Sequence, residues 1–442
     1  MAIFNDAGLL PSCCEHRFGS KNQLMMHPSL RWIVFAIVAV FLLFGVTLDK
    51  IAGISFYLLM LLGIVAIVMG GRDSIQSYFQ NLQTYWPLHL AMSGFLICAA
   101  INQIVLPHVS SKDYNFGLYF FAFVIFFWLF LQLSTRQFSL LSWAFTIGAL
   151  IATVKIYVFT NGGEFRGHPN FMPLLAYSEL AATLGILALL SIDWDPPRSS
   201  FIQSLSIVIK MTAGCSGLYA IYLYQSRGAW LAIPVFAISV CIAFMKNARY
   251  FKKLAAALAI IAIIAMIYGS TCSVQQRLAQ AQSDMSELSK SSNMDTSIGT
   301  RYQLWKGSLL IIKHHIGFGV GNDGFAGAMH QLADQGKISF ASAKFPHSHN
   351  EFLFSAVIFG VFGIVALVLL YFLPTLYFFR HTKNQSAQSR AAALMGVVLC
   401  LSFFTDGLVD VMFLWHEAAL FYTIVLSFLM AATIHFQQSA TH

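Results

Sequence analysis

Stretches of about 20 apolar residues recur along most of this chain. Of its 442 residues, 58% are hydrophobic and only 10% are charged, and the mean hydropathy is +0.70. A water-soluble protein could not cover so much apolar surface, whereas one such stretch, as a helix, spans the hydrocarbon core of a bilayer. The sequence therefore predicts an all-α polytopic membrane protein.

The apolar stretches predict about twelve membrane-spanning helices. They lie near residues 31–49, 51–70, 88–106, 117–133, 138–159, 171–192, 203–224, 229–245, 253–270, 351–379, 391–405 and 416–435. We therefore expect five parts in chain order: a cytoplasmic N-terminal segment (1–30), nine spans (31–270), a large loop or cap outside the membrane (271–350), three spans (351–435) and a cytoplasmic tail (436–442).

The distribution of basic residues sets the orientation. With the N-terminus inside, the cytoplasmic segments contain Arg17, Lys21, Arg31, Arg72, Arg136, Arg198, Lys246, Arg249, Lys252, Lys253, Arg380, Lys383 and Arg390. The short loops on the other face contain only Lys50, Lys112, Arg166 and Arg227. This bias follows the positive-inside rule and places the 271–350 loop outside. It also explains most of the net charge of +8, which therefore does not indicate a nucleic-acid partner.

The outer loop contains one stretch with helical periodicity, residues 300–314. Apolar and small residues share a stripe at helical spacing, with Lys306 and Lys313 off it; they are Leu304, Trp305, Ser308, Leu309 and Ile312. We expect an amphipathic helix that lies on the outer leaflet or docks on the bundle.

The loop re-enters the membrane through the polar segment Phe345–Glu351, which contains His347, His349 and Asn350. Polar and ionisable groups at membrane depth are expensive to hold there, so this segment is predicted to be a functional site. Two histidines at i and i+2 could ligate a metal, but the sequence shows no clear cluster of partner ligands, and no metal is expected.

The pattern G-x-G-x-x-G at Gly319–Gly324 resembles a dinucleotide-binding motif. No strand precedes it, no βαβ unit surrounds it and it lies outside the cytoplasm. We interpret these residues as turn-forming glycines, and no nucleotide or other cofactor is expected.

Several other polar residues are predicted on the same outer face: Arg166, Arg227 and Arg301, with Asp406 and Asp410 at the end of the eleventh span. A single arginine there is more often an interfacial snorkelling residue than a ligand. However, the guanidinium fork suits phosphate oxygens, and a histidine can remove a proton from a hydroxyl. Together these residues indicate group transfer from a lipid diphosphate to a hydroxyl acceptor.

Four segments in order resemble the lipopolysaccharide O-antigen ligase family, within the superfamily of O-antigen polymerases and bacterial O-oligosaccharyltransferases. They are residues 225–229 (QSRGA), 299–305 (GTRYQLW), 346–351 (PHSHNE) and 407–411 (GLVDV). A large outer loop before the tenth of twelve spans also agrees. The resemblance implies a fold like that of the membrane-embedded GT-C glycosyltransferases.

The resemblance implies transfer of a preassembled O-antigen glycan from undecaprenyl diphosphate to a sugar hydroxyl of lipid A–core. The reaction would be inverting and metal-independent, at the periplasmic face of the bacterial inner membrane, with membrane lipids around the protein. Carried over by position, His349 is the base and Arg227 and Arg301 hold the diphosphate. Arg166 is a further candidate, in a loop that reads Arg-Gly-His-Pro-Asn where the superfamily has Arg-Gly-Asn-Pro-Asn. The supporting residues are His347, Asn350, Glu351 and Asp410.

Three other functions stay open at this point. An O-antigen polymerase and a protein O-oligosaccharyltransferase would use the same kind of site. A transporter or flippase would instead need ionisable residues near the middle of the bilayer. Away from the first residues of the predicted spans, only two basic residues lie inside them, Lys155 and Lys210. We expect Lys210 to snorkel to the cytoplasmic surface.

Overall fold

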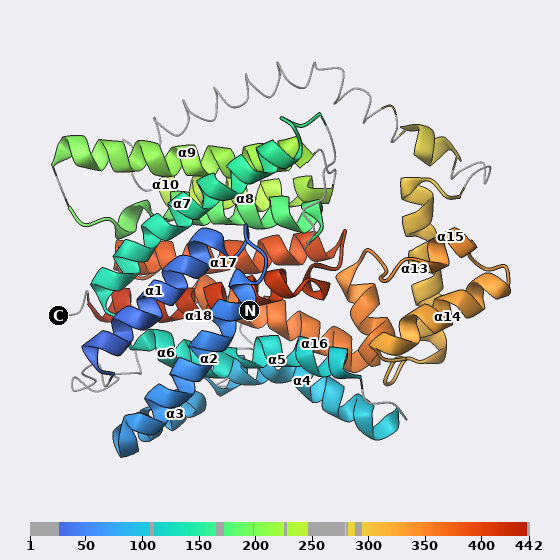
Figure 1. Cartoon of the computed structure of the whole chain (residues 1–442), viewed down its shortest axis with the longest axis horizontal. Helices are drawn as coiled ribbons and strands as arrows, with labels where there is room; N and C mark the ends of the chain where they lie inside the picture. Colours follow the sequence, from blue (N-terminus) through green and yellow to red (C-terminus); the bar gives the residue numbers. More distant parts are fainter. Residues whose placement is uncertain are drawn as a thin grey trace.

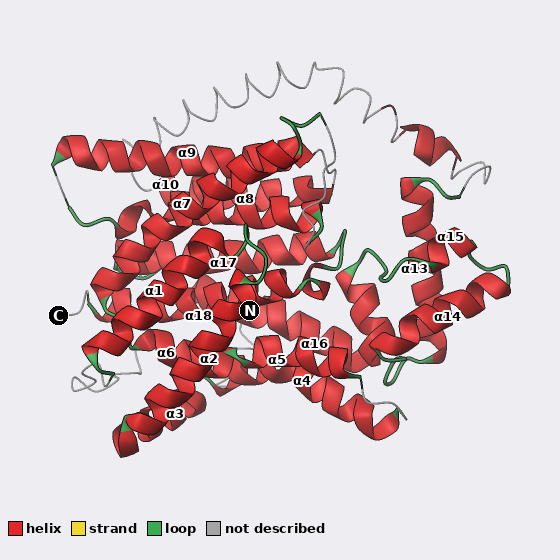
Figure 2. Ribbon diagram, in the orientation of Figure 1, coloured by secondary structure: helices red, strands yellow, loops and turns green. Residues whose placement is uncertain are grey.

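The computed structural model describes residues 26–106, 110–164, 172–197, 199–224, 228–245, 279, 282–287 and 294–439. Within these residues the regular secondary structure is helical throughout (Figures 1 and 2). Long helices form a bundle, and three shorter helices form a cap at one end of it (Figure 1). The predicted all-α membrane class is confirmed.

Nine helical stretches among the described residues are long and apolar enough to cross a membrane. They are α2 (Ile51–Met69), α4 (Trp86–Val105), α5 with α6 (Ser111–Phe121, Phe123–Leu131), α7 (Thr135–Phe159), α8 with η1 (Leu174–Leu190, Ser191–Trp194), α9 (Ser200–Tyr224), α16 (Glu351–His381), α17 (Ala387–Gly407) and α18 (His416–Gln438).

Two shorter apolar helices coincide with the predicted first and eighth spans: α1 (Pro28–Phe44), and η2 with α10 (Gly228–Ala232, Ile233–Met245). The predicted ninth span, 253–270, lies outside the described residues. The total of twelve therefore stays a prediction. The polar helix α3 (Gly71–Thr84) between α2 and α4 was not predicted, because its sequence lacks an apolar stretch.

The centre of the bundle is α8, in which every residue is buried. It packs against α7, α9 and α17. Because the helix is surrounded by protein on all sides, its apolar residues occur all round it rather than in one stripe. The helices around it each keep one face toward the outside, which in a membrane is lipid.

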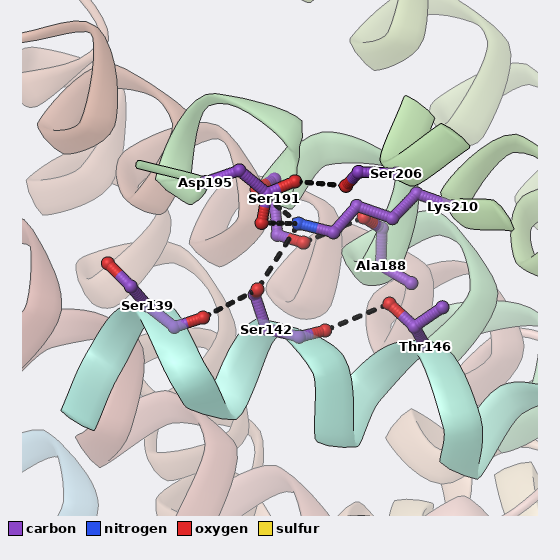
Figure 3. A network of polar contacts seen from close by, with 8 residues as sticks. All are labelled: Ser139, Ser142, Thr146, Ala188, Ser191, Asp195, Ser206 and Lys210. Carbon is purple, nitrogen blue, oxygen red and sulfur yellow. Dashed lines mark hydrogen bonds and ion pairs between the residues drawn. The ribbon is translucent and has the colours of Figure 1, made fainter. Parts of the chain in front are cut away.

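Lys210 of α9 does not snorkel, so that prediction is wrong. Its side chain is fully buried, and its ammonium group donates to the Asp195 carboxylate at 2.8 Å, the Ser191 carbonyl at 3.0 Å and the Ser142 hydroxyl at 3.2 Å (Figure 3). Ser206 also donates to Asp195. All three ammonium protons have partners, so the pair ties α7, η1 and α9 together. The prediction used only the position of Lys210 near the end of its span. That position could not reveal these partners, because they come from other helices.

The outer part of α16 is a separate helical piece. Gly360 has φ 63° and ψ −147°, a conformation that is essentially restricted to glycine, and it divides the element into Glu351–Phe359 and Val361–His381. The segment 316–321 satisfies the freed backbone groups through three hydrogen bonds: Val320 N–H to the Val357 carbonyl (2.8 Å), Gly321 N–H to the Ile358 carbonyl (3.0 Å) and Val361 N–H to the Ile316 carbonyl (2.8 Å).

The first two glycines of the G-x-G-x-x-G pattern, Gly319 and Gly321, lie in this contact segment and confirm the interpretation as turn residues, whereas Gly324 lies inside α14. Gly319 and Gly321 both have positive φ, 69° and 72°. A Cβ on Gly319 would lie 2.4 Å from the carbonyl oxygens of both Val357 and Ile358. The first glycine is therefore required by the close approach of two backbones.

The cap consists of α13 (Ser297–His314), α14 (Asn322–Asp334) and α15 (Phe340–Ala343). Helix α13 begins three residues before the predicted start, where the Thr296 side chain accepts a hydrogen bond from Gly299 N–H. It runs across the direction of the bundle helices (Figure 1). The predicted single stripe is wrong: Leu304 and Ser308 are buried, whereas Trp305 and Leu309 are exposed.

We predict that Lys210→Met destabilises the protein by about 3–5 kcal/mol, because it leaves a largely buried carboxylate unpaired. The double variant Lys210→Met/Asp195→Leu should recover part of this loss, because no unpaired charge then remains. Thermal unfolding of the purified protein in detergent measures both, with the exposed Lys383→Met as the control. Equal stabilities of Lys210→Met and wild type would show that the pair is not structural.

We also predict that Gly319→Ala destabilises the protein by more than about 1 kcal/mol, because alanine at φ 69° is strained and its Cβ meets two carbonyls. The matched control is Gly327→Ala in α14, where no atom lies within 4 Å of the new Cβ. That change should be neutral or stabilising. The same unfolding assay separates them, and an unaffected Gly319→Ala would contradict the backbone contact.

Candidate functional site

The histidine segment connects α15 to α16, and His349 has an unusual backbone conformation. Its φ is 49°, in the left-handed region. A residue other than glycine in this region costs of order 1 kcal/mol or more, and such residues cluster at functional sites. Asn350 follows in an extended conformation and caps α16, since its side-chain oxygen accepts from Leu353 N–H at 2.9 Å. The bend at His349 therefore turns the chain sharply just before the helix starts.

His349 is hydrogen-bonded to Asp410, which lies in the loop between α17 and α18. The distance from His349 Nδ1 to Asp410 Oδ1 is 3.0 Å. Because the carboxylate accepts this bond, the proton of the neutral imidazole is assigned to Nδ1, which leaves Nε2 as an acceptor. The side chain of His349 is 22% exposed and that of Asp410 only 6%. The pair is therefore buried on the aspartate side and reachable on the histidine side.

Asp410 is held in its charged form. Burial by itself would raise the pKa of Asp410, but the surrounding groups, foremost the hydrogen bond from His349, outweigh burial, so the pKa lies below its usual range. Val411 N–H also donates to the same carboxylate oxygen at 2.9 Å. A charged aspartate at Nδ1 fixes the orientation of the imidazole ring and leaves Nε2 as the free nitrogen, as a general base requires.

Three consecutive residues, His349, Asn350 and Glu351, all bind the same loop. His349 contacts Asp410, the Asn350 amide donates to the Leu408 carbonyl at 3.0 Å, and the fully buried Glu351 accepts from Phe413 N–H at 3.0 Å. The His-Asn-Glu segment thus clamps residues 408–413 at three points. Asn350 and Glu351 act on the geometry of the Asp410 loop, and their supporting role in catalysis stays a prediction.

His347 supports His349 from the other side. Its Nδ1 accepts a hydrogen bond from His349 N–H at 3.2 Å, and the two ring centroids lie 4.4 Å apart. Burial lowers the pKa of His347 to about 4, against the opposing effect of Asp410. His347 is therefore neutral near pH 7, and its 3.7 Å approach to Asp410 is not an ion pair. Its hydrogen bond helps to hold the strained backbone of His349.

The same three side chains could also hold a metal ion, since one donor atom of each of His347, His349 and Asp410 lies within 4.8 Å of the others. The sequence did not show this cluster, because Asp410 lies about 60 residues from the histidines. A cation would compete with the hydrogen bonds described above for Nδ1 of His349 and for the carboxylate. The donor set fits both a metal and a hydrogen-bonded dyad.

Of the three predicted arginines, the structure describes only Arg301. It lies in the first turns of α13 and is half-buried. Its charge contributes to lowering the pKa of His347, so it acts within electrostatic reach of the histidine pair. Arg166 and Arg227 lie outside the described residues. The structure therefore brings together Arg301, His347, His349 and Asp410.

Sequence reasoning missed one buried acid near this site, Glu179 of α8. Glu179 and Asp406 of α17 are each 1% exposed. Glu179 interacts electrostatically with Asp406, Asp410 and Arg301, and Asp406 with Asp410. Both oxygens of Glu179 and Oδ1 of Asp406 lack a hydrogen-bond partner in the structure. An acid inside the apolar stretch 171–192 was the signal that could have identified it.

Comparisons with known proteins show similarity to O-antigen ligases. Residues 213–368 match the family model for O-antigen ligase, a segment that includes Arg301, His347 and His349. An uncharacterized protein of Haemophilus influenzae is 26% identical over 208 residues, which cover 46% of this chain and 50% of that protein. The O-antigen ligase of Escherichia coli K12 is 24% identical over 312 residues, which cover 68% of this chain and 67% of that protein.

The chain thus spans half the length of the first relative and about two thirds of the second. The matched family segment extends from α9 through the cap into α16, and the similarity to the Escherichia coli protein extends well beyond it. These matches, with the helices long enough to cross a bilayer, support assignment of this multi-pass membrane protein to the O-antigen ligase superfamily.

Proposed function

We propose that this protein is a glycosyltransferase that ligates O-antigen to lipid A–core. The donor is a preassembled glycan on undecaprenyl diphosphate, the acceptor is a sugar hydroxyl of lipid A–core, and the site faces the periplasm from the inner membrane. The observation that carries the proposal is the His349–Asp410 hydrogen bond in a membrane protein of the O-antigen ligase superfamily, with Arg301 in electrostatic reach.

The bond changes follow from this geometry. Nε2 of His349 takes the proton of the acceptor hydroxyl as its oxygen attacks the anomeric carbon of the donor sugar. The bond from that carbon to the diphosphate oxygen breaks, and the leaving diphosphate keeps the electron pair. A single displacement of this kind inverts the anomeric centre. The proton ends on His349, where the Asp410 carboxylate stabilises the imidazolium.

Arginines would stabilise the leaving group. A diphosphate gains negative charge as its bond to the sugar breaks, and a planar guanidinium can donate two parallel hydrogen bonds to its oxygens. Arg301 is assigned this role, together with Arg227 and Arg166 by their position in the sequence. In this scheme neither a nucleotide nor another cofactor is needed.

An O-antigen polymerase and a protein O-oligosaccharyltransferase remain alternatives, since they differ only in the acceptor. A transporter is less well supported. Lys210, one of the two basic residues inside the predicted spans away from their first residues, uses all three ammonium protons on partners in its own structure and has none left for a cargo.

Deletion of the gene distinguishes these functions. We expect full-length glycan to accumulate on undecaprenyl diphosphate while lipid A–core stays bare, as seen on a gel of envelope glycolipids. A band with a single repeat would indicate a polymerase instead. A change in protein mass with normal lipopolysaccharide would indicate a protein glycosylase.

We predict that His349→Ala lowers the rate of transfer by about 10²–10⁴-fold, because the general base is lost. Asp410→Asn should lower it by at least about tenfold, because asparagine cannot stabilise the imidazolium. Both are measured with purified protein, donor and acceptor. The control is His330→Ala, an exposed histidine of α14 that should keep wild-type activity.

Wild-type activity of His349→Ala would remove His349 from the reaction. A different result would change the interpretation of the cluster: loss of activity with a chelator, restored by one divalent ion, would make His347, His349 and Asp410 metal ligands.

We predict that Arg301→Lys lowers the rate by about 10²–10³-fold, because a point charge does not replace the two-pronged donor of a guanidinium. Arg227→Lys should fail in the same way. Lys337→Gln, which removes an exposed charge elsewhere in the cap, is the control and should have little effect. If Arg301→Lys keeps full activity, Arg301 does not contact the diphosphate.

A further inference from the structure

Helix α13 of the cap exposes a continuous apolar face. Tyr302, Trp305 and Leu309 are 47%, 38% and 58% exposed, and Ile316, just beyond the helix end, is 66% exposed. The spacing of three and four residues places the three helical positions within an arc of about 60°. Three large apolar side chains in one narrow stripe are unusual for a helix in water. We call these four residues the α13 stripe.

The opposite face of α13 already has its partners. Leu304, Ser308 and Ile311 are buried, and the helix packs against α14, α15 and α16. These residues therefore form the apolar face through which α13 docks on the rest of the protein. The α13 stripe is additional, so it does not serve the packing of the cap.

The neighbouring cap helix, α14, shows what a water-facing surface of this cap looks like. Its large apolar residues Phe325, Met329 and Leu332 are buried. Its exposed positions are small or polar, among them Asp323, His330, Gln331 and Asp334. Both helices belong to the same cap, so the difference between their exposed faces indicates different surroundings.

The α13 stripe is continuous with the lipid-facing side of α16. The Ile316 carbonyl accepts a hydrogen bond from Val361 N–H at 2.8 Å, and the ring of Phe318 stacks on that of Phe362 with 5.7 Å between centroids. Val361, Phe362 and Val365 are 46%, 40% and 51% exposed at the start of a membrane-spanning piece. In a bilayer such side chains contact lipid, so the stripe begins where the lipid-facing surface of this span ends.

The residue types of α13 also fit the interface between acyl chains and head groups. Tryptophan and tyrosine are enriched at this depth, and lysines beside an apolar surface extend toward phosphates. Lys306 and Lys313 are both exposed, and at about 100° per residue both fall next to one edge of the stripe. Their charge complements the phosphates of phospholipid head groups.

We propose that α13 lies in the outer leaflet of the membrane, with the α13 stripe inserted at the boundary of head groups and acyl chains. The occupant of the stripe is bilayer phospholipid. This inference rests on exposure and continuity, and it holds whichever glycan or acceptor the protein uses. It has one consequence for the site: Arg301, on the same helix, is kept near the depth of lipid phosphates.

The test is a depth measurement on the full chain in lipid nanodiscs. An environment-sensitive fluorophore is attached at Leu309→Cys in a chain whose native cysteines are replaced. The nanodiscs contain phosphatidylethanolamine and phosphatidylglycerol, with or without bromine on the acyl chains. We expect a blue-shifted emission that brominated lipid quenches at least about twofold. Gln331→Cys on α14 should show neither effect, and Val365→Cys on α16 should show both.

Two outcomes would overturn the proposal. Emission at position 309 that matches position 331 would mean that the stripe faces water. A blue-shifted emission that brominated lipid does not quench would mean that protein covers it, either residues 246–278 of this chain or a second copy. Size-exclusion chromatography shows whether each labelled variant is folded.

A second variant tests the stripe as a unit. With the fluorophore at Trp305→Cys, the added change Leu309→Glu should reduce quenching by brominated lipid by about half or more, because a carboxylate resists insertion. The change Gln331→Glu on α14 should leave quenching unaltered. Neither measurement uses substrate, so failure here and failure of the proposed glycan transfer are separate results.

Discussion

The position of the site depends on how the outer part of α16 satisfies its backbone. A helix that breaks near a bilayer frees carbonyl and amide groups that lipid cannot bind, so a break survives only where other parts of the protein supply partners. Residues 316–321 do so at Gly360 through three backbone hydrogen bonds, and the Asn102 side chain of α4 adds a fourth to the Ile358 carbonyl at 2.9 Å. The outer piece, Glu351–Phe359, can therefore leave the axis of the span and bring its first residues against the loop between α17 and α18.

The clamp on that loop follows from this placement. His349, Asn350 and Glu351 each contact a different residue of 408–413, so the two halves of the site cannot shift independently. The left-handed backbone of His349 and the hydrogen bond from its N–H to His347 add to this rigidity. The strained conformation of His349 persists because the surrounding contacts stabilise it. Such preorganisation holds Nε2 in one orientation before any substrate is present.

Two charged pairs in this protein illustrate how a structural pair and a functional one differ. The Lys210–Asp195 pair is buried, and every proton of its ammonium group has a partner. No hydrogen-bond donor is left for a ligand. In the His349–Asp410 pair the aspartate is buried and accepts a hydrogen bond from His349, whereas the histidine is partly exposed and only its Nδ1 is hydrogen-bonded. The free Nε2 is what makes the second pair capable of proton transfer, whereas the first ties helices together.

Composition and apolar periodicity alone determined the helical membrane class and most of the apolar helices, because burial in lipid requires long uninterrupted apolar helices. They also identified His347, His349 and Asp410 as separate residues of interest. Only the tertiary structure decided that Asp410 is the partner of His349, that Lys210 is an internal ion pair and that α13 has two different faces. Each of these depends on contacts between residues far apart in the chain, and a local pattern carries no information about which distant side chain lies within 3 Å.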